Sequence, residues 1–347
     1  MKIGTLTFHW ATNFGAILQA YALQQWIRKQ GIETEIIDYV PWKNVLGQRY
    51  NWIRKLKISN FIKELKLKRF RKKYLVRSKK FPSSEKLKKC RDSYDMVICG
   101  SDQIWNMSFT FNGEFKNTLS YFADFAGENT KRLAYAVSFG TDKVSDDYIS
   151  LTKTEVSKFS SISVREQTGL DVVKQLGSSA RVVCDPTLLL PKNDYDRLIG
   201  EGSESGQKIF SYVLRDNKET IETVKLVQKI FECNDEIDTK SNYGLIEWLK
   251  KIKYSEIVVT NSYHGVVLSL IFNTPFVAVL PPESGMNDRL VTILTEVGLS
   301  DRIVQSPDYE AIKKICGSKI DWTAVNASIE GIRQDSETYL SEHIRRV

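Results

Sequence analysis

The sequence lacks the long apolar runs and leader segments that mark membrane and secreted proteins. None of its apolar runs approaches the roughly 18 residues that a membrane-spanning helix needs. The N-terminus, MKIGTLTFHW, has neither the apolar core nor the small-residue cleavage site of a signal peptide. We therefore expect a soluble protein of the cytoplasm.

Cysteine and histidine are scarce, which limits metal and redox chemistry. The five cysteines show no CxxC pair and no metal-type spacing, and Cys99 and Cys184 lie in apolar runs typical of buried strands. The three histidines are His9, His264 and His343. There is no Cys–His pair, GxSxG, GxGxxG or Walker motif. We expect no metal and no cofactor, and neither a dinucleotide nor a nucleoside triphosphate is supported.

The chain has the length and the pattern of two α/β domains. It has 347 residues, of which 42% are hydrophobic and 27% charged. Near the N-terminus a strand, a loop, a helix, Gly31 and a second strand form a βαβ unit, which predicts a parallel sheet. The pattern predicts strands within segments 2–9, 34–40, 94–100, 131–140, 160–166 and 180–190. After a predicted linker at 191–207, it predicts further strands within 208–214, 256–260 and 274–280.

The positive charge is concentrated in one segment. Residues 54–80 contain thirteen Lys or Arg and one Glu, a net charge of +12, so the rest of the chain is about −4. Apolar residues recur there at helical spacing, which predicts a basic amphipathic helix or helix pair within 52–80. The segment is a docked helix with a solvated basic face, a surface for anionic lipid or lipid-linked pyrophosphate, or a nucleic-acid surface. No helix-turn-helix, RNP or zinc-finger pattern supports the last alternative.

A polar turn, SYHG (262–265), joins the predicted strand EIVVT to an apolar helix. Ligands of parallel sheets lie at the carboxyl ends of strands, and the start of a helix attracts an anion. His264 at such a place can transfer a proton near neutral pH. The alternative is a histidine that caps the helix or packs under a loop.

Two arginines also occupy loop positions. Arg165, in SVRE, follows a predicted strand of the first domain, and Arg289, in GMNDRL, precedes a predicted helix. A guanidinium can bind a carboxylate or phosphate with two hydrogen bonds. The alternatives are a structural pair of Arg165 with Glu166 or another acid, and a solvated Arg289. With His264, the two arginines suggest a site for a small, doubly anionic ligand.

The loop GSDQIWN (100–106) combines residue types that often bind sugars. The ring of Trp105 could stack on a sugar, while Asp102, Gln103 and Asn106 could bond to hydroxyls. The alternative is a loop whose tryptophan fills the core and whose aspartate caps a helix. The earlier loop TNFGA, which contains Asn13, could bind a phosphate at the first helix. DPT (185–187) is interpreted as a turn.

In this order, seven segments resemble the polysaccharide pyruvyl transferase family: TNFGAILQAYAL, YDMVICGSDQIWN, YAVSFG, SVRE, DPTLL, SYHGVVLSLIFNTPFV and, less closely, GMNDRL. They extend from the first loop to about residue 300 and leave 54–80 and the tail after 305 uncovered. The resemblance implies a GT-B-like fold of two Rossmann-like, doubly wound domains facing one another across a cleft. We expect domains at 1–195 and 205–325, with a last helix, 326–347, that crosses back to the first.

The resemblance also implies the reaction. Phosphoenolpyruvate would be the donor, a sugar of a capsule or exopolysaccharide precursor the acceptor, and a cyclic pyruvyl ketal the product. Arg165 matches the family's arginine after the mid-chain strand, and His264 matches its histidine. We expect Arg165 and Arg289 to bind the donor's anionic groups and His264 to be the general acid/base.

The remaining site residues are assigned to donor and acceptor. Ser262, Tyr263 and Gly265 would complete the donor site. Many relatives have Arg and Leu in place of Ser262 and Tyr263, so Arg289 is our candidate for the missing cation. The expected acceptor residues come from the first domain: Asn13, Asp102, Gln103, Trp105 and Asn106.

Two other functions are kept open. One is a GT-B glycosyltransferase that uses a nucleotide sugar, and the other is a non-catalytic, membrane-associated sugar-binding protein. In the main hypothesis the basic segment suits an acceptor linked to a lipid pyrophosphate, and peripheral contact with the inner face of the plasma membrane. We expect no nucleic-acid partner.

Overall fold

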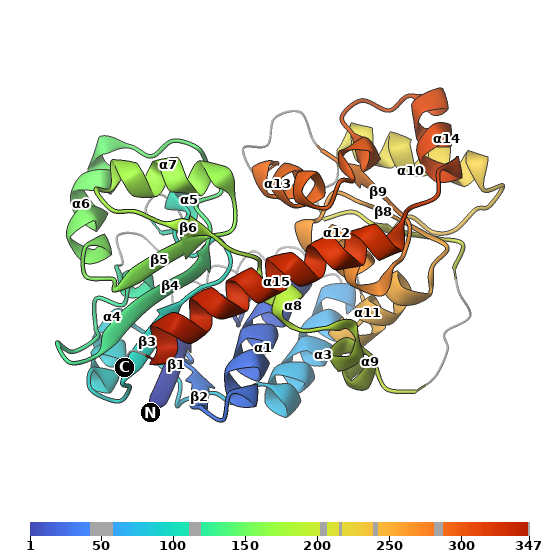
Figure 1. Cartoon of the computed structure of the whole chain (residues 1–347). Helices are drawn as coiled ribbons and strands as arrows, with labels where there is room; N and C mark the ends of the chain where they lie inside the picture. Colours follow the sequence, from blue (N-terminus) through green and yellow to red (C-terminus); the bar gives the residue numbers. More distant parts are fainter. Residues whose placement is uncertain are drawn as a thin grey trace. The chain divides into compact units, whose positions relative to one another are not determined.

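The computed structural model describes residues 1–41, 58–110, 119–201, 207–214, 217–238, 242–280 and 287–345. It divides into two compact units, each with one parallel sheet (Figure 1). The first unit comprises Met1–Ile58, Leu67–Leu189 and Arg333–Val347, and the second comprises Ser59–Lys66 and Leu190–Ile332. The predicted linker is wrong in part, because Lys192–Ile199 forms helix α9.

The sheet of the first unit has six strands in the order β2-β1-β3-β4-β5-β6, all parallel. They are β1 (Lys2–Leu6), β2 (Glu33–Ile36), β3 (Met96–Cys99), β4 (Lys131–Val137), β5 (Ser161–Val164) and β6 (Arg181–Val182). The six strands predicted before residue 190 are thereby confirmed. Because the chain goes from β1 to β2 on one side and continues with β3 on the other, β1 and β3 flank a topological switch point.

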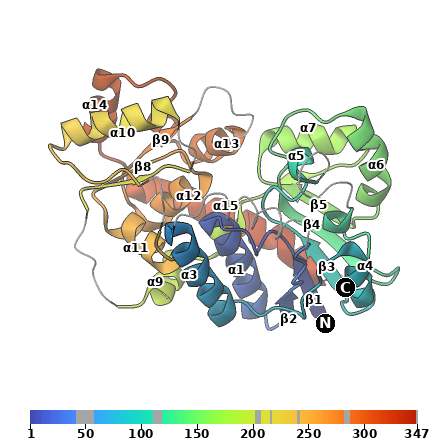
Figure 2. The ribbon, with the colours of Figure 1, turned by 180° about the vertical axis from the view of Figure 1, so that it is seen from behind.

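Helices of the first unit cover both faces of this sheet. They are α1 (Phe14–Lys29), α4 (Ser84–Leu87), α5 (Met107–Thr110), α6 (Asp146–Val156), α7 (Gln167–Gln175), α8 (Pro186–Leu189) and the later part of α15 (Trp322–Arg345). Helix α1 contacts the later part of α15, which crosses it in Figure 2, and Trp26 Nε1 donates to Glu337 Oε1 at 3.0 Å. Helix α8 also contacts α15, because Arg333 Nε donates to the carbonyl of Leu188 at 2.7 Å.

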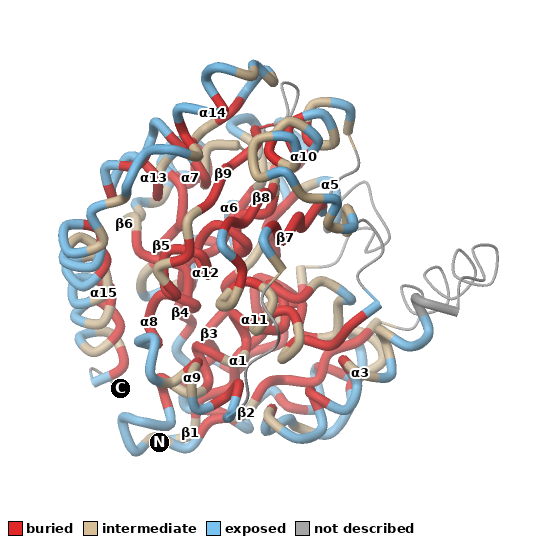
Figure 3. Tube along the Cα trace, turned by 90° about the vertical axis from the view of Figure 1, so that its right-hand side faces the viewer, coloured by how far each residue is buried: buried red, intermediate tan, exposed pale blue. Residues whose placement is uncertain are grey.

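Alternation along β4 separates the two faces. Ala134 belongs to a buried cluster with Tyr148 of α6 and Val172 of α7. The next residue, Tyr135, points the other way, and its ring lies 6.5 Å from that of Tyr339 on α15. This is the period of two that a strand imposes on a sheet covered on both sides. Most strand residues are accordingly buried in both units (Figure 3).

The sheet of the second unit is smaller. Its strands β7 (Ile209–Tyr212), β8 (Ile257–Thr260), β9 (Phe276–Val279) and β10 (Ile303–Val304) are parallel and adjacent in that order. The three strands predicted here are confirmed, and β10 was missed. A parallel bridge pairs Tyr212 with Asp238 on the free edge of β7, before the chain returns to β8 on the other edge. Strands β7 and β8 therefore flank a second switch point.

The second unit also contains five further helices. They are α10 (Lys218–Ile230), α11 (Leu245–Tyr254), α12 (Tyr263–Phe272), α13 (Asp288–Glu296) and α14 (Tyr309–Gly317). The predicted basic helix is α3 (Ile58–Tyr74), of which Ser59–Lys66 groups with the second unit and the rest with the first. Residues 52–57 of that prediction lie outside the described residues. None of the described helices is long and apolar enough to cross a membrane.

Candidate functional site

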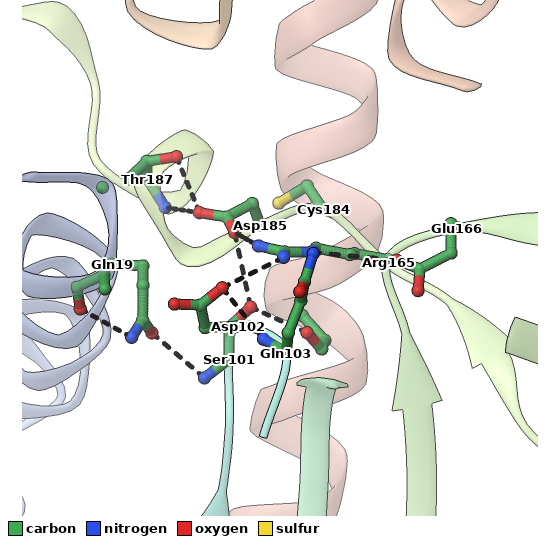
Figure 4. A network of polar contacts seen from close by, with 12 residues as sticks. Gln19, Ser101, Asp102, Gln103, Arg165, Glu166, Cys184, Asp185 and Thr187 are labelled. Carbon is green, nitrogen blue, oxygen red and sulfur yellow. Dashed lines mark hydrogen bonds and ion pairs between the residues drawn. The ribbon is translucent and has the colours of Figure 1, made fainter. Parts of the chain in front are cut away.

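At the first switch point, hydrogen bonds tie together the loops that follow β1 and β3. Thr7 Oγ1 donates to the carbonyl of Ser101 at 2.8 Å. The amide of Gln19 on α1 bridges both loops: its Nε2 donates to Thr7 Oγ1 at 2.8 Å, and its Oε1 accepts from Ser101 N at 3.0 Å (Figure 4). All three side chains are buried. The position of the loop after β3 is therefore set by β1 and α1.

Gly100 lets this loop pass close to β4. Its φ is +128°, in a region that side chains disfavour. A Cβ atom there would lie 2.0 Å from the carbonyl oxygen of Tyr135. Only glycine fits this backbone, which places Ser101 and Asp102 beside the end of β4.

Arg165, just after β5, lies among three carboxylates (Figure 4). Its Nη1 donates to Asp185 Oδ2 at 2.8 Å, its Nη2 donates to Asp102 Oδ1 at 3.2 Å, and its Nε lies 3.7 Å from Glu166 Oε2. The side chains of Arg165 and Asp185 are 0% exposed. A further anion would meet an excess of negative charge here. The geometry favours the alternative in which Arg165 pairs with acids over a direct anion-binding role.

Asp185 anchors this arginine. Its Oδ2 also accepts from Ser101 Oγ at 3.3 Å, and its Oδ1 accepts from the backbone N and the hydroxyl of Thr187 at 3.0 and 2.8 Å. DPT was interpreted only as a turn, so the anchoring role was missed. A single acid inside the apolar run ARVVCDPTLLL was the available signal, because a buried carboxylate needs partners. Gln19 on an apolar helix gave a similar signal.

The loop that follows Ser101 buries its tryptophan and also the side chains of Gln103 and Asn106. Asp102 Oδ1 also accepts from Gln103 N at 2.9 Å, and Asn106 Nδ2 donates to Gln103 Oε1 at 3.0 Å. Trp105 is 0% exposed, its Nε1 donates to the carbonyl of Tyr121 at 3.0 Å, and its ring stacks on Phe122 at 4.8 Å. A fully buried ring offers no face to a sugar. We therefore correct the expected acceptor contact of Trp105 to a role in the core.

Asn13 occupies the start of α1. Its Oδ1 accepts from the backbone N of Gly15 at 2.8 Å and of Ala16 at 3.3 Å, so it is the N-cap of this helix. An N-cap side chain satisfies backbone donors that the helix itself leaves unpaired. The side chain of Asn13 therefore stabilises the start of α1, next to the first switch point.

At the second switch point, helix α12 begins directly after β8. Ser262 is its N-cap, and its Oγ accepts from Gly265 N at 3.3 Å. Thr260 Oγ1 donates to the carbonyl of Tyr212 at 2.6 Å and accepts from Ser262 N at 3.0 Å. A Cβ on Gly265 would lie 2.8 Å from Thr260 Oγ1, so glycine lets the helix start against the strand end.

Three of the residues predicted for the donor site come together here. The rings of Tyr263 and His264 meet edge to face at 5.2 Å. The guanidinium carbon of Arg289, in the first turn of α13, lies 5.5 Å from the centre of the Tyr263 ring. The start of α12 carries positive potential from its backbone N–H groups, and Arg289 adds a full positive charge. This arrangement suits an anion beside a histidine.

His9, after β1, is a contrasting histidine. Its Nδ1 lies 3.2 Å from the carbonyl of Thr7 and its Nε2 lies 3.0 Å from Asp38 Oδ1. Both partners are hydrogen-bond acceptors, and the two contacts fix the orientation of the buried ring. Burial alone would raise the pKa of Asp38, but the hydrogen bond and charge of His9, with the charge of Arg77, lower it. His9 is therefore a structural ion-pair partner.

The described residues contain no group of three or more His, Cys, Asp or Glu side chains placed to hold a metal ion.

Comparisons with known proteins agree with this architecture. The sequence model of the polysaccharide pyruvyl transferase family matches residues 13–282. The UDP-N-acetylglucosamine 2-epimerase of Rickettsia bellii is a structural neighbour at TM-score 0.52 and 10% identity, with 100% of each chain covered. The UDP-GlcNAc 2-epimerase of Neisseria meningitidis, bound to UDP-GlcNAc, has TM-score 0.50 and 8% identity, also with 100% of each chain covered. No curated protein sequence gives a significant match.

At these identities the neighbours show the fold alone. They are GT-B-type proteins, and the two parallel α/β sheets of this chain confirm the predicted GT-B-like class of two Rossmann-like domains. That the two domains face one another across a cleft stays a prediction.

Proposed function

Because the chain belongs to the polysaccharide pyruvyl transferase family, we propose that it moves the enolpyruvyl group of phosphoenolpyruvate onto a sugar. The family makes it a transferase that acts on polysaccharide. The acceptor would be a sugar of a capsule or exopolysaccharide precursor, and the product a cyclic pyruvyl ketal. The observation that carries the proposal is the group of His264, Tyr263 and Arg289 at the start of α12.

The reaction needs a proton donor beside an anion site. One proton is added to the methylene carbon of phosphoenolpyruvate, which becomes a methyl group. The neighbouring carbon forms bonds to two sugar hydroxyl oxygens, and its bond to the phosphate oxygen breaks. The two hydroxyls release two protons, one of which replaces the proton delivered to carbon, and the other leaves with phosphate.

The second unit supplies groups of the required kind. The N–H groups at the start of α12 and the guanidinium of Arg289 would bind the carboxylate and phosphate of the donor. His264, in the first turn of the same helix, would deliver the proton to the methylene carbon. Arg289 would also supply the cation that many relatives carry where this chain has Ser262 and Tyr263.

The test is a calorimetric titration with phosphoenolpyruvate and, separately, with UDP-sugars. Proteins to compare are the wild type, Arg289→Gln and the control Arg197→Gln, whose side chain is 80% exposed on α9. We expect the wild type and the control to bind phosphoenolpyruvate alike. Arg289→Gln should bind it at least about 10-fold more weakly, since a hydrogen bond to a charged group contributes about 1.5–3 kcal/mol. Binding of a UDP-sugar and none of phosphoenolpyruvate would favour a nucleotide-sugar glycosyltransferase.

Helix α3 supports a second, separate part of the proposal: peripheral contact with an anionic membrane that carries a lipid-linked acceptor. Phe61, Ile62 and Leu65 are 48%, 40% and 40% exposed. One to three turns further on, four cations are exposed: Lys68, Arg69, Lys72 and Lys73. Exposed apolar side chains followed by cations suit a surface of anionic headgroups above acyl chains.

Sedimentation with lipid vesicles tests this contact. We expect binding to phosphatidylglycerol vesicles and little binding to phosphatidylcholine vesicles. Lys72→Glu with Lys73→Glu should weaken binding by about 10-fold or more, since each cation near an anionic surface contributes about 1 kcal/mol. The matched control is Lys218→Glu with Lys225→Glu, two exposed positions on α10. Equal loss in both pairs would reject α3 as the contact.

A further inference from the structure

We propose that Asp102 binds an acceptor hydroxyl and takes its proton, and that Arg165 is the residue that positions Asp102. This inference rests on the proposed function. It differs from the expectation that Arg165 itself binds the donor.

The two oxygens of Asp102 have different surroundings. Oδ1 accepts from Arg165 Nη2 at 3.2 Å and from Gln103 N at 2.9 Å. Oδ2 takes no hydrogen bond from any residue that the structure describes, and the side chain is 16% exposed. One oxygen is therefore held by the protein while the other is available to a ligand.

The backbone of Asp102 is held as well. Its carbonyl accepts from Ser138 N at 3.0 Å, and a parallel bridge pairs Asp102 with Val137 at the end of β4. The preceding residue, Ser101, is fixed by Thr7 and Gln19. A carboxylate with a fixed backbone and one fixed oxygen is pre-organised for a single direction of hydrogen bonding.

Arg165 has the features of a positioning residue. Its side chain is 0% exposed, and its Nη1 is bonded to the equally buried Asp185. Asp185 in turn accepts hydrogen bonds from the hydroxyl of Ser101 at 3.3 Å and from the hydroxyl of Thr187 at 2.8 Å. The guanidinium therefore connects a buried anchor to the partly exposed Asp102. Such supporting contacts orient a functional group.

Charge at this switch point selects the kind of ligand. Asp102, Asp185 and Glu166 surround the one guanidinium of Arg165, so the group is negative when all four are ionised. Phosphoenolpyruvate would be repelled. A neutral sugar would not be repelled, because a hydroxyl donates its hydrogen to a carboxylate.

In the proposed reaction, one sugar hydroxyl loses its proton to the carboxylate of Asp102. The oxygen of one sugar hydroxyl forms a bond to the pyruvyl carbon, and its proton passes to Oδ2 of Asp102. When the bond between that carbon and the phosphate oxygen has broken, Asp102 releases its proton to water, and the released phosphate takes up one proton from water. The carboxylate is then regenerated, and no further reactant is needed.

The experiment compares Asp102→Asn, Arg165→Lys and the double variant with the wild type. Asp171→Asn, at an exposed position on α7, is the control. Phosphate release gives kcat and the acceptor KM, calorimetry gives the Kd of phosphoenolpyruvate, and thermal unfolding reports folding. Asp102→Asn is nearly isosteric and removes only one partner of Arg165, which keeps the test valid if Arg165→Lys folds poorly.

We expect Asp102→Asn to lower kcat at least about 100-fold, as general acid–base groups do, with the Kd of phosphoenolpyruvate unchanged within about two-fold. Arg165→Lys should lower kcat by a smaller factor. The double variant should be no slower than Asp102→Asn, because Arg165 acts through Asp102. Asp171→Asn should match the wild type.

Three results would overturn the assignment. They are a kcat of Asp102→Asn close to wild type, a phosphoenolpyruvate Kd raised about 10-fold or more in folded Arg165→Lys, and effects that multiply in the double variant. The second result would make Arg165 a donor ligand. A wild type that neither binds phosphoenolpyruvate nor releases phosphate would reject the proposed function itself, and this assignment with it.

Discussion

The two switch points have the same topology and opposite charge. In the first unit, one arginine lies among three carboxylates, and buried hydrogen bonds connect the loops that follow β1 and β3. In the second unit, a helix N-terminus, a histidine and an arginine beside a tyrosine form a positive group. The fold thus sets where ligands bind, while side-chain charge sets which ligands they are. Under our proposals, the first switch point would bind a neutral sugar and the second a dianion.

The histidines give the same lesson at the level of single residues. His9 and His264 both follow a parallel strand at a switch point. His9 is bonded through both ring nitrogens to acceptors of its own unit, so its task is structural. His264 lies in the first turn of α12 beside Tyr263, where an anion would be held. Location after a strand is therefore not enough to identify a catalytic histidine, and hydrogen-bond partners are needed as well.

The largest expected effect would come from His264. His264→Asn should lower kcat by about 10²–10⁴-fold at saturating phosphoenolpyruvate, because the group that delivers the proton is lost. Phosphate release measures this. The control is His343→Asn on α15, whose Nδ1 lies 2.7 Å from the carbonyl of Tyr339. If the kcat of His264→Asn stays within two-fold of wild type, His264 does not deliver the proton, and the second switch point is not distinguished by a catalytic histidine.

The next effect concerns Trp105, which we assign to the core of the first unit and not to sugar binding. Trp105→Ala should lower the free energy of unfolding by about 3–5 kcal/mol, as is usual for buried aromatic truncations. Urea unfolding measures it. Trp105→Phe should fold with a smaller loss and keep the acceptor KM of the wild type. An acceptor KM raised about 10-fold in stable Trp105→Phe would indicate that the Trp105 ring stacks on the sugar. It would also weaken the case for the acidic group as the acceptor site.

A smaller effect is expected from Gly265→Ala at the second switch point. The added methyl would lie 2.8 Å from Thr260 Oγ1, so the start of α12 must shift. We expect a loss of about 1–3 kcal/mol in stability, typical of overpacking, together with weaker phosphoenolpyruvate binding in calorimetry. Gly331→Ala on α15, where the new methyl meets nothing within 4 Å, should instead gain about 0.5–1 kcal/mol. Unchanged donor binding in Gly265→Ala would argue that the start of α12 is not the anion site.

The smallest effect is the pH dependence that Asp38 gives the first unit. Its pKa is below the ordinary value of 3.8 in the folded protein. Its contribution is therefore complete above the unfolded pKa and is lost as pH falls through the folded pKa. Asp38→Asn should reduce the difference in the free energy of unfolding between pH 6 and pH 3, measured by urea unfolding. If both proteins lose the same stability over this range, His9 and Asp38 do not form the ion pair that we describe.

Periodicity made the fold predictable, and buried polar groups were hard to assign. Alternating and apolar runs located nine of the strands, but β10 has only two residues and leaves no pattern. The group around Tyr263 and His264 followed from one rule, that loops after parallel strands meet at one edge. Composition could not decide whether Trp105 faces a sugar or the core, because either role uses the same residue. The anchoring of Arg165 by Asp185 joins residues 20 apart in sequence and needed the packed structure.

The division of the chain into units has a consequence for how the protein is made. Residues 190–332 of the second unit are synthesised before residues 333–345. The first unit needs those last residues, because Glu337 bonds to Trp26, Ser336 to the backbone of Cys184 and Tyr339 to Ser161. Domains fold as units during synthesis when their residues are available. The first unit, whose strands are synthesised earliest, is therefore the last to be completed, and a stop codon before residue 333 would remove the part of α15 that contacts Tyr135 and Ser161.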